Sequence, residues 1–167
     1  AKLNAEDAIK NNAKIIEHNK VIHIELLKDF WKIFLEDGLT IKSKILINAS
    51  GPWINETMKN LIKVESGRKI RLVKGSHIIT KKLYEDNIAF TLQNDDKRIV
   101  FVIPYKEEFS LIGTTEVEVN SPDDNKIEEF KKNYLIDCVN KYFLKQININ
   151  DIVDTFSGIR PLIEDFK

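Results

Sequence analysis

Two side chains in this 167-residue sequence are suited to chemistry on an anionic substrate, and each lies close to a glycine. His77 follows Gly75 by two positions, and Arg160 follows Gly158 by two. A neutral imidazole can accept a proton near neutral pH, and a guanidinium offers a fork of hydrogen-bond donors to a phosphate or carboxylate. Glycine has no Cβ, so we expect the backbone at both glycines to allow close approach of a ligand.

Each of these two side chains also has an ordinary structural interpretation. A histidine at the start of a strand often makes one structural hydrogen bond, and spacing alone favours that role for His77. Arg160 could pair with a nearby carboxylate such as Asp154 or Glu164 instead of binding a ligand. The residue types therefore leave both interpretations open.

The remaining charged residues give weaker signals. Arg71 and Lys74 could add positive charge at the sheet edge where His77 and Arg160 are expected, although neighbouring lysines favour a solvated surface for Lys74. The acidic pairs Asp95-Asp96, Glu107-Glu108 and Asp123-Asp124 are adjacent in sequence, so the two members of a pair cannot face one substrate from one strand. We interpret these pairs as solvated loops.

Composition excludes several classes of function. Lys and Arg total 26, as do Asp and Glu, so no net charge favours nucleic acid or an anionic membrane. The single cysteine, Cys138, lies on the apolar stripe of an expected helix, which indicates a core residue. We find no cluster of metal ligands, no Ser/His/Asp order and no Walker-type glycine loop, and we expect no metal.

The first third of the sequence predicts one helix and a small group of strands. Apolar spacing favours a helix from Asn4 to about Glu17. Antiparallel strands are expected at residues 21–27, 30–35 and 39–41, and the apolar run at 44–48 suggests a buried parallel strand. Without its parallel neighbours, that last strand would expose an apolar edge able to pair with a second copy of the chain.

The sharp turn Ala49-Ser-Gly-Pro-Trp53 joins this run to a helical pattern that continues to Ile62. A strand, a glycine turn and a helix can together bring backbone N–H groups to an anionic ligand. Such turns are also common connectors, so the turn by itself is a weak signal.

From Ile70 onward the pattern is rich in strands. We expect them at residues 70–73, 77–80, 88–93, 98–104, 109–113 and 152–156, with a helix introduced at 121–124 and carried by apolar residues from Ile127 to Tyr142. The predicted fold class is therefore α+β, with a mainly antiparallel sheet of about six to eight strands and helices on one face.

Six strings in fixed order resemble the FAD-dependent glycerol-3-phosphate dehydrogenases over nearly the whole chain. They are Asn48-Ala-Ser-Gly-Pro-Trp53, Arg71-Leu-Val-Lys-Gly-Ser-His77, Gln93-Asn-Asp-Asp-Lys-Arg98, Ile99-Val-Phe-Val-Ile-Pro104, Ile112-Gly-Thr-Thr-Glu116 and Ser157-Gly-Ile-Arg-Pro161. The resemblance implies part of a Rossmann-type FAD-binding domain at 1–55, a substrate-binding domain at 56–155 and a return towards the FAD domain at 156–167.

The resemblance also implies a reaction. A flavin would take a hydride from C2 of glycerol 3-phosphate, giving dihydroxyacetone phosphate, and would pass the electrons to quinone. The full-length enzyme would be cytoplasmic and peripheral to the inner membrane. In that picture His77 and Arg160 are catalytic, Arg160 binds the substrate with Arg71 and Lys74, and His77 is the candidate for accepting the hydroxyl proton. The residues implied at the FAD are Val21, Ala49, Ser50, Gly51, Trp53, Gly75 and Gly158.

The sequence also departs from the family pattern. The G-x-G-x-x-G phosphate loop of the FAD domain is missing, so we interpret the chain as the middle of an enzyme and expect negligible FAD affinity from the chain alone. Tightly held yellow flavin on the purified chain would contradict that expectation. The alternatives are a non-catalytic remnant or piece of a split protein, and an amine-oxidising member of the same superfamily.

Overall fold

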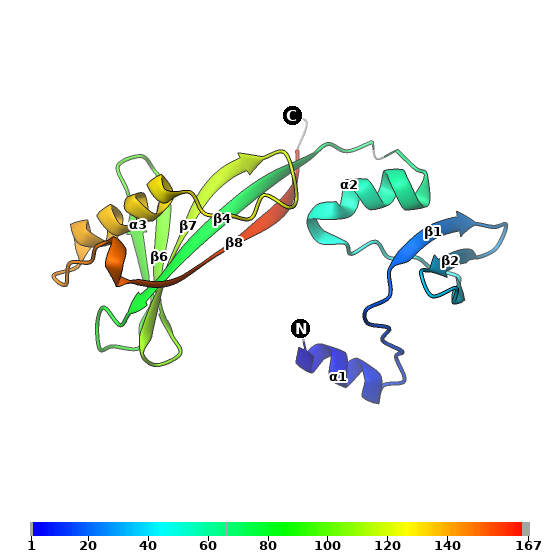
Figure 1. Cartoon of the computed structure of the whole chain (residues 1–167), viewed down its shortest axis with the longest axis horizontal. Helices are drawn as coiled ribbons and strands as arrows, with labels where there is room; N and C mark the ends of the chain where they lie inside the picture. The colour runs from blue at the N-terminus through cyan, green and yellow to red at the C-terminus, as the bar shows by residue number, and fades with distance from the viewer. Residues whose placement is uncertain (1, 66, 165–167) are drawn as a thin grey trace. The chain divides into compact units, whose positions relative to one another are not determined.

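The computed structural model describes residues 2–65 and 67–164, which form two compact units (Figure 1). Within the described residues, the first unit comprises 2–50 and 54–65, and the second comprises 51–53 and 67–164. These limits differ from the expected boundaries at 55 and 155. The helical segment from Ile54 belongs to the first unit, and the final strand runs from Ile152 to Ile163, into the segment that was expected to return towards the FAD domain.

The first unit has a three-stranded antiparallel sheet in the order β1-β2-β3. Its strands are β1 (Val21–Leu26), β2 (Trp31–Leu35) and β3 (Thr40–Ser43), and its helical segments are α1 (Lys2–Lys10), α2 (Ile54–Glu56) and η2 (Thr57–Ile62). Ile24, Ile33 and Leu35 form its buried core. The expected turn at residues 36–38 joins β2 to β3, and Gly38 has a φ of 89°, which glycine adopts without steric cost.

Two sequence-based predictions for this unit are wrong. The first helix ends at Lys10 and not near Glu17, because Asn12 adopts a left-handed φ of 67°. The expected strand at 44–48 does not form. Ser43 Oγ donates to the Ile45 carbonyl and lies 3.3 Å from the Ile45 N–H, so this side chain occupies backbone groups that a strand would pair.

The second unit is built on a five-stranded antiparallel sheet in the order β5-β6-β7-β4-β8 (Figure 1). Its elements are η1 (Gly51–Trp53), β4 (Ile70–Lys81), β5 (Phe90–Gln93), β6 (Ile99–Tyr105), β7 (Phe109–Val119), α3 (Glu129–Tyr142), η3 (Ile149–Asp151) and β8 (Ile152–Ile163). The two strands expected at 70–73 and 77–80 are one continuous strand. Gly75 and Ser76 pair with β7 on one side and with β8 on the other, and this double ladder overrides the weak strand preference of glycine.

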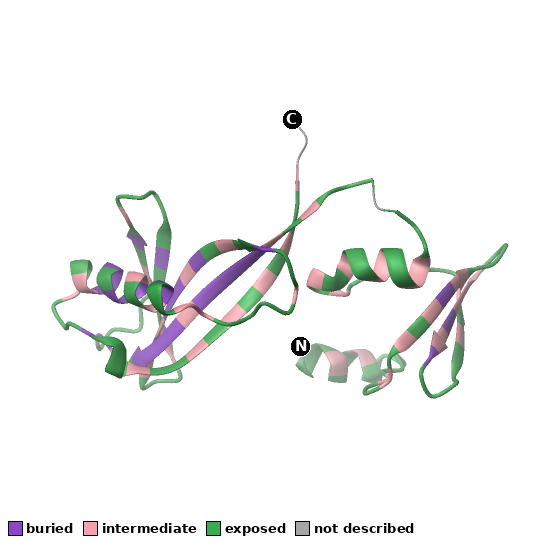
Figure 2. Cartoon of the chain, turned by 45° about the horizontal axis from the view of Figure 1, so that its top comes forward, coloured by how far each residue is buried: buried purple, intermediate pink, exposed green. Residues whose placement is uncertain are grey.

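Helix α3 covers one face of this sheet. Ile78, Val100, Val102 and Ile112 are fully buried against the helix, and Figure 2 shows buried positions along β4. Cys138 is 4% exposed in the same cluster, so its expected place in the core is confirmed. Because side chains alternate along a strand, the residues of β4 on either side of Ile78 point to the opposite face.

We call that opposite face the open face, since α3 does not cover it. It carries Gly75 and His77 from β4, Gly113 and Glu116 from β7, Phe156 and Arg160 from β8, and Phe101 from β6. Cross-strand partners point the same way, which places all of them together. Phe101 and Phe156 are both more than 40% exposed (42% and 46%), so the open face presents apolar surface beside its charged groups.

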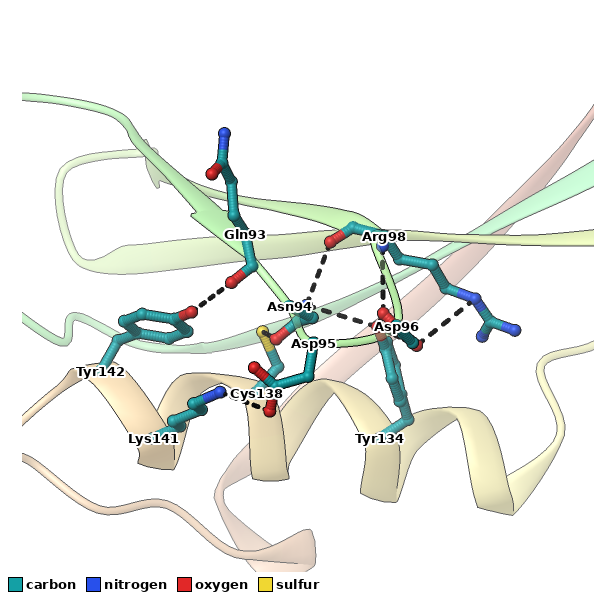
Figure 3. A network of polar contacts seen from close by, with 9 residues as sticks. All are labelled: Gln93, Asn94, Asp95, Asp96, Arg98, Tyr134, Cys138, Lys141 and Tyr142. Atoms are coloured by element: carbon teal, nitrogen blue, oxygen red, sulfur yellow. Dashed lines mark hydrogen bonds and ion pairs between the residues drawn. The ribbon is translucent and has the colours of Figure 1, made fainter.

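The turn between β5 and β6 is docked onto α3 by polar contacts (Figure 3). Tyr134 Oη donates to Asp96, Asn94 Nδ2 lies 3.3 Å from Tyr134 Oη, and Lys141 Nζ lies 2.9 Å from Asp95 Oδ2. The interpretation of Asp95-Asp96 as a solvated loop is confirmed for Asp95, whose side chain is 95% exposed. It is incomplete for Asp96, which accepts a hydrogen bond from Tyr134 of the helix.

Lys74 lies on the α3 face and not on the open face. Its side chain is 1% exposed, and its Nζ lies 2.9 Å from Glu128 Oε1, 3.2 Å from Asp124 Oδ1 and 2.8 Å from the Lys126 carbonyl oxygen. Burial by itself lowers the pKa of Lys74, but the hydrogen bonds that it donates to Glu128 and Asp124 outweigh burial, and the net pKa is raised. Neither a solvated surface nor a role in binding substrate fits this position.

We expect Lys74→Met to lower the free energy of unfolding by about 2 kcal/mol, because it leaves two carboxylates without their buried cation. Urea unfolding followed by circular dichroism measures this. The matched control is Lys141→Met, which removes an ion pair whose lysine is 46% exposed, with an expected cost below about 0.5 kcal/mol. Equal losses in the two variants would contradict the structural role of Lys74.

None of the helices in the described part of the chain is long and apolar enough to span a membrane.

Candidate functional site

His77 lies in the middle of β4, between Gly113 of β7 and Phe156 of β8. Its ring stacks on Phe156 with 4.6 Å between the ring centroids and 8° between the planes. A Cβ added to Gly113 would lie 2.2 Å from His77 Cδ2, closer than real contacts allow. Gly113 therefore makes room for the imidazole, and Phe156 fixes the plane of the ring.

The environment of His77 favours the neutral ring. Burial lowers its pKa, and the positive charge of Arg160 lowers it further. Nδ1 is buried and has no hydrogen-bond partner among the residues that the structure describes. A neutral imidazole with a free nitrogen is the form that a general base requires.

The Arg160 side chain reaches from β8 across β4 and contacts two residues of β7. Nη1 donates to Glu116 Oε1 at 3.0 Å, and Nη2 lies 3.4 Å from Thr114 Oγ1. A Cβ on Gly75 would lie 2.3 Å from Nη2 of Arg160. The guanidinium thus occupies the space that Gly75 leaves free.

This arrangement changes the expected role of the glycines. The space over Gly75 is taken by Arg160, so it is not open to a ligand as the sequence suggested. Gly158 has nothing within 4 Å of where its Cβ would be, which leaves the backbone open there. Gly113 was not singled out for this role, although it stands in one of the six strings.

The partner of Arg160 also differs from the two that were considered. Asp154 accepts a hydrogen bond from the Thr155 backbone, and Glu164 Oε2 lies 3.3 Å from Lys69 Nζ. The actual partner is Glu116, which the register of β7 against β4 brings opposite Gly75. A register between distant strands is not visible in the sequence, so this residue was missed.

The structure therefore brings together some of the predicted substrate residues and separates others. His77 and Arg160 lie on one face, close enough for the charge of Arg160 to lower the pKa of His77. Arg71 shares that face, with its Nη1 4.0 Å from Glu118 Oε2. Lys74 is on the opposite face with its own carboxylates.

A pocket of about 590 Å³ opens on this face beside Arg160. Glu116 and Thr114 line it from β7, and Ile99 and Phe101 line it from β6. Its size is in the range of small-molecule sites, and it combines an apolar wall with three cationic residues, Lys97, Arg98 and Arg160. Such a pocket suits a small anion that carries a short carbon chain.

We expect the NMR titration of His77 in the full chain to have its midpoint below the ordinary value of about 6.5. Because protonation is disfavoured in the folded chain, the contribution of His77 to stability is complete above that value and falls as the pH drops through it. Arg160→Met removes the nearby positive charge and should move the midpoint upward. A midpoint at or above the ordinary value in the unmodified chain would contradict this account of the site.

The candidate cofactor residues fall into two groups. Val21, Ala49 and Ser50 line a pocket of about 370 Å³ in the first unit, together with apolar side chains such as Ile24 and Leu61. Ser50 Oγ donates to Asn48 Oδ1 at 2.7 Å, which places a polar edge beside the apolar wall. The pocket fits a flat, mainly apolar ring with polar substituents, such as part of a flavin nucleotide.

The other candidate cofactor residues belong to the second unit. Gly51 and Trp53 are in η1, which lies against β8, and Trp53 is 43% exposed. Gly75 and Gly158 pair with each other across β4 and β8. Of these two glycines, Gly158 offers an open backbone and Gly75 does not.

A second polar cluster, around Cys138, does not form a reactive site. Burial raises the pKa of the thiol, which donates to Asn94 Oδ1 at 3.1 Å. Asp95 and Asp96 next to it are occupied by Lys141 and Tyr134 (Figure 3). In the described ranges, no three His, Cys, Asp or Glu residues are grouped in a way that could hold a metal ion.

Comparison with known proteins gives the family. The family described as DAO, FAD dependent oxidoreductase, matches residues 1–167. The chain belongs to this family. It is 39% identical over 168 residues to the aerobic glycerol-3-phosphate dehydrogenase of Escherichia coli (strain K12), covering 97% of this chain and 34% of the relative. It is 40% identical to the glycerol-3-phosphate dehydrogenase of Pseudomonas aeruginosa, covering 98% of this chain and 33% of the relative.

The chain thus spans about a third of the length of these relatives. Among solved structures, the glycerol-3-phosphate dehydrogenase from Bacillus halodurans complexed with FAD matches with a TM-score of 0.81 and 24% identity, covering 95% of this chain and 34% of that one. At this identity the likeness shows the fold. The predicted family and the α+β class with an antiparallel sheet are confirmed. The expected single sheet of six to eight strands is wrong, because the second unit has a five-stranded sheet and the first unit has a separate sheet of three strands.

Proposed function

We propose that this chain supplies the substrate-binding sheet of an FAD-dependent glycerol-3-phosphate dehydrogenase, which oxidises sn-glycerol 3-phosphate to dihydroxyacetone phosphate. The observation that carries the proposal is the open face, where His77 and Arg160 lie together and each uses the space left by a glycine on the adjacent strand. The names of the relatives that are about 40% identical support the choice of substrate.

In the proposed reaction the chain's own residues bind the anion and accept the proton. Donors of Arg160 that are not used by Glu116 or Thr114 bind the phosphate or polarise the C2 oxygen. When bound, FAD would supply the hydride acceptor, at N5, for oxidation of the C2 alcohol, and His77 would accept the proton of the C2 hydroxyl on its free ring nitrogen. Phe101 and Phe156 flank the site and limit the access of water.

We assign the cofactor contacts by the same reasoning. Val21, Ala49 and Ser50 would hold one part of FAD in the pocket of the first unit. In the second unit, Gly158 leaves backbone open at the strand that also carries Arg160, and the exposed ring of Trp53 offers a flat apolar surface.

The electron acceptor and location are part of the proposal. Quinone is the acceptor that the sequence resemblance implies, with the full-length enzyme cytoplasmic and peripheral to the inner membrane. Oxygen is the competing acceptor, since a relative 32% identical is named alpha-glycerophosphate oxidase, from Lactococcus lactis. An acceptor assay with a soluble quinone and with oxygen separates the two.

One observation favours a second substrate of the same class. A D-erythritol 1-phosphate dehydrogenase from Brucella abortus is 34% identical over 171 residues, covering 99% of this chain. The pocket beside Arg160 has a volume of about 590 Å³, which leaves room for a longer polyol phosphate. We propose glycerol 3-phosphate first because the relatives that carry its name are more similar to this chain.

The test is a chimera in which this chain replaces the matching third of the Escherichia coli enzyme. We expect it to bind FAD and to oxidise glycerol 3-phosphate faster than erythritol 1-phosphate, with no activity on glycine. A chimera without FAD would contradict the cofactor contacts. One that holds FAD but oxidises no polyol phosphate would favour a non-catalytic remnant, and oxidation of glycine would favour the amine-oxidising alternative.

A further inference from the structure

A carboxylate that the proposed chemistry does not use lies beside Arg160. Glu116 is on β7, opposite Gly75 of β4, and its Oε1 is 3.0 Å from Nη1 of Arg160. Thr114, two residues earlier, has its Oγ1 3.4 Å from Nη2. Both residues belong to the string at 112–116, of which only Gly113 has so far been given a role.

The shape of β7 explains how both side chains reach Arg160. The ladder pairs Ser76 with Thr115 and then His77 with Gly113, so Thr114 is an extra residue on β7. An extra residue in one strand changes where the neighbouring side chains point. Here it sets Gly113 against His77 while Thr114 and Glu116 both contact the guanidinium.

These contacts occupy one edge of Arg160 and leave the rest free. A guanidinium has five N–H donors. Glu116 and Thr114 take one each, so in the described residues the other three have no hydrogen-bond partner. The missing Cβ of Gly75 lets the group lie close against β4.

We propose that Glu116 is a positioning residue for Arg160. Together with Thr114 it holds the guanidinium over Gly75 before substrate binds, with the three remaining donors turned toward the anion. Holding a flexible side chain in advance removes the entropy cost of ordering it during binding. The effect on catalysis rests on the proposed function, whereas the position of Arg160 does not.

The exposure of the pair supports positioning over stability. The side chains of Arg160 and Glu116 are 44% and 62% exposed, and exposed ion pairs contribute little to folding. Substitution of Glu116 should therefore leave the sheet intact. The same face offers a control pair, Arg71 of β4 and Glu118 of β7, with 4.0 Å between Arg71 Nη1 and Glu118 Oε2. Glu118 lies two residues after Glu116 on the same strand.

The first measurement uses the full chain and needs no catalysis. The chain has four arginines, so the Nε–H signal of Arg160 can be assigned in ¹⁵N NMR by its loss in Arg160→Lys. We expect Glu116→Ala to speed the solvent exchange of this signal, Glu116→Gln to preserve it because the amide oxygen still accepts, and Glu118→Gln to leave it unchanged. An Arg160 signal that is unaffected by Glu116→Ala would overturn the inference.

The second measurement uses the chimera. We expect Glu116→Ala to lower kcat/KM for glycerol 3-phosphate about tenfold and Glu116→Gln to restore most of it, as loss and recovery of one charge-assisted hydrogen bond predict. An unchanged kcat/KM in Glu116→Ala, or equal losses in the two variants, would contradict positioning. If the unsubstituted chimera is inactive while the NMR effect is present, the proposed function fails, but the inference that Glu116 positions Arg160 stands.

Discussion

His77→Gln in the chimera should lower kcat about 10³-fold, the usual scale for loss of a general base. Glutamine keeps the size and polarity of the side chain near those of histidine, but it cannot accept the proton from the C2 hydroxyl. The stacking on Phe156 and the gap at Gly113 place the imidazole without any hydrogen bond to its Nδ1 among the described residues. The substitution should therefore remove the base and change little else.

The pH dependence provides the sharper criterion for this prediction. With histidine, kcat/KM should rise with pH through the lowered pKa of His77 and then level off, because only the neutral ring accepts a proton. In His77→Gln that rise should disappear. The control is His23→Gln, on β1 of the first unit beside Glu25, which should keep the kcat of the parent. A His77→Gln enzyme with the parent's turnover and pH profile would eliminate His77 as the base.

Gly75→Ala should lower kcat/KM about 100-fold through an effect on Arg160, at the scale of one strong charged contact. The new Cβ would lie 2.3 Å from Arg160 Nη2 and 2.6 Å from Thr114 Oγ1, so the guanidinium must move off the strand. Both atoms are at the ends of side chains that can rotate. We therefore expect a small loss of stability, about 1 kcal/mol or less, beside a large loss of activity.

A double-mutant cycle separates this mechanism from general damage to the sheet. If Gly75→Ala acts by displacing Arg160, adding it to Arg160→Ala should cost nothing further. Losses that add up in the double variant would show that the alanine harms the site by another route. Gly67→Ala, where no atom lies within 4 Å of the new Cβ, controls for replacing glycine in this unit.

The family and the general fold could be predicted from the sequence because short local strings carry them. The strings that end in His77 and contain Arg160 fall on neighbouring strands of one antiparallel sheet, as expected. Lys74 was misplaced for a local reason. The strand was expected to break at 74–76, and a continuous strand puts Lys74 on the face opposite to His77.

Other features depend on contacts that a sequence does not display. Glu116 is the partner of Arg160 because an extra residue in β7 sets its register, and no composition or spacing rule predicts that register. The run at 44–48 is apolar enough for a buried strand, yet Ile45 and Ile47 are 73% and 82% exposed. A buried strand needs a neighbouring strand, and none is formed with this run in the described part of the chain.

The most direct test of the central claim is anaerobic reduction of the flavin in the chimera. The account predicts that glycerol 3-phosphate bleaches the visible absorbance of bound FAD, that glycerol without phosphate does so far more slowly, and that His77→Gln abolishes the rapid phase. Bound FAD that stays oxidised in the presence of glycerol 3-phosphate, or that is reduced equally fast by glycerol, would contradict the assignment of the open face as the site of polyol phosphate oxidation.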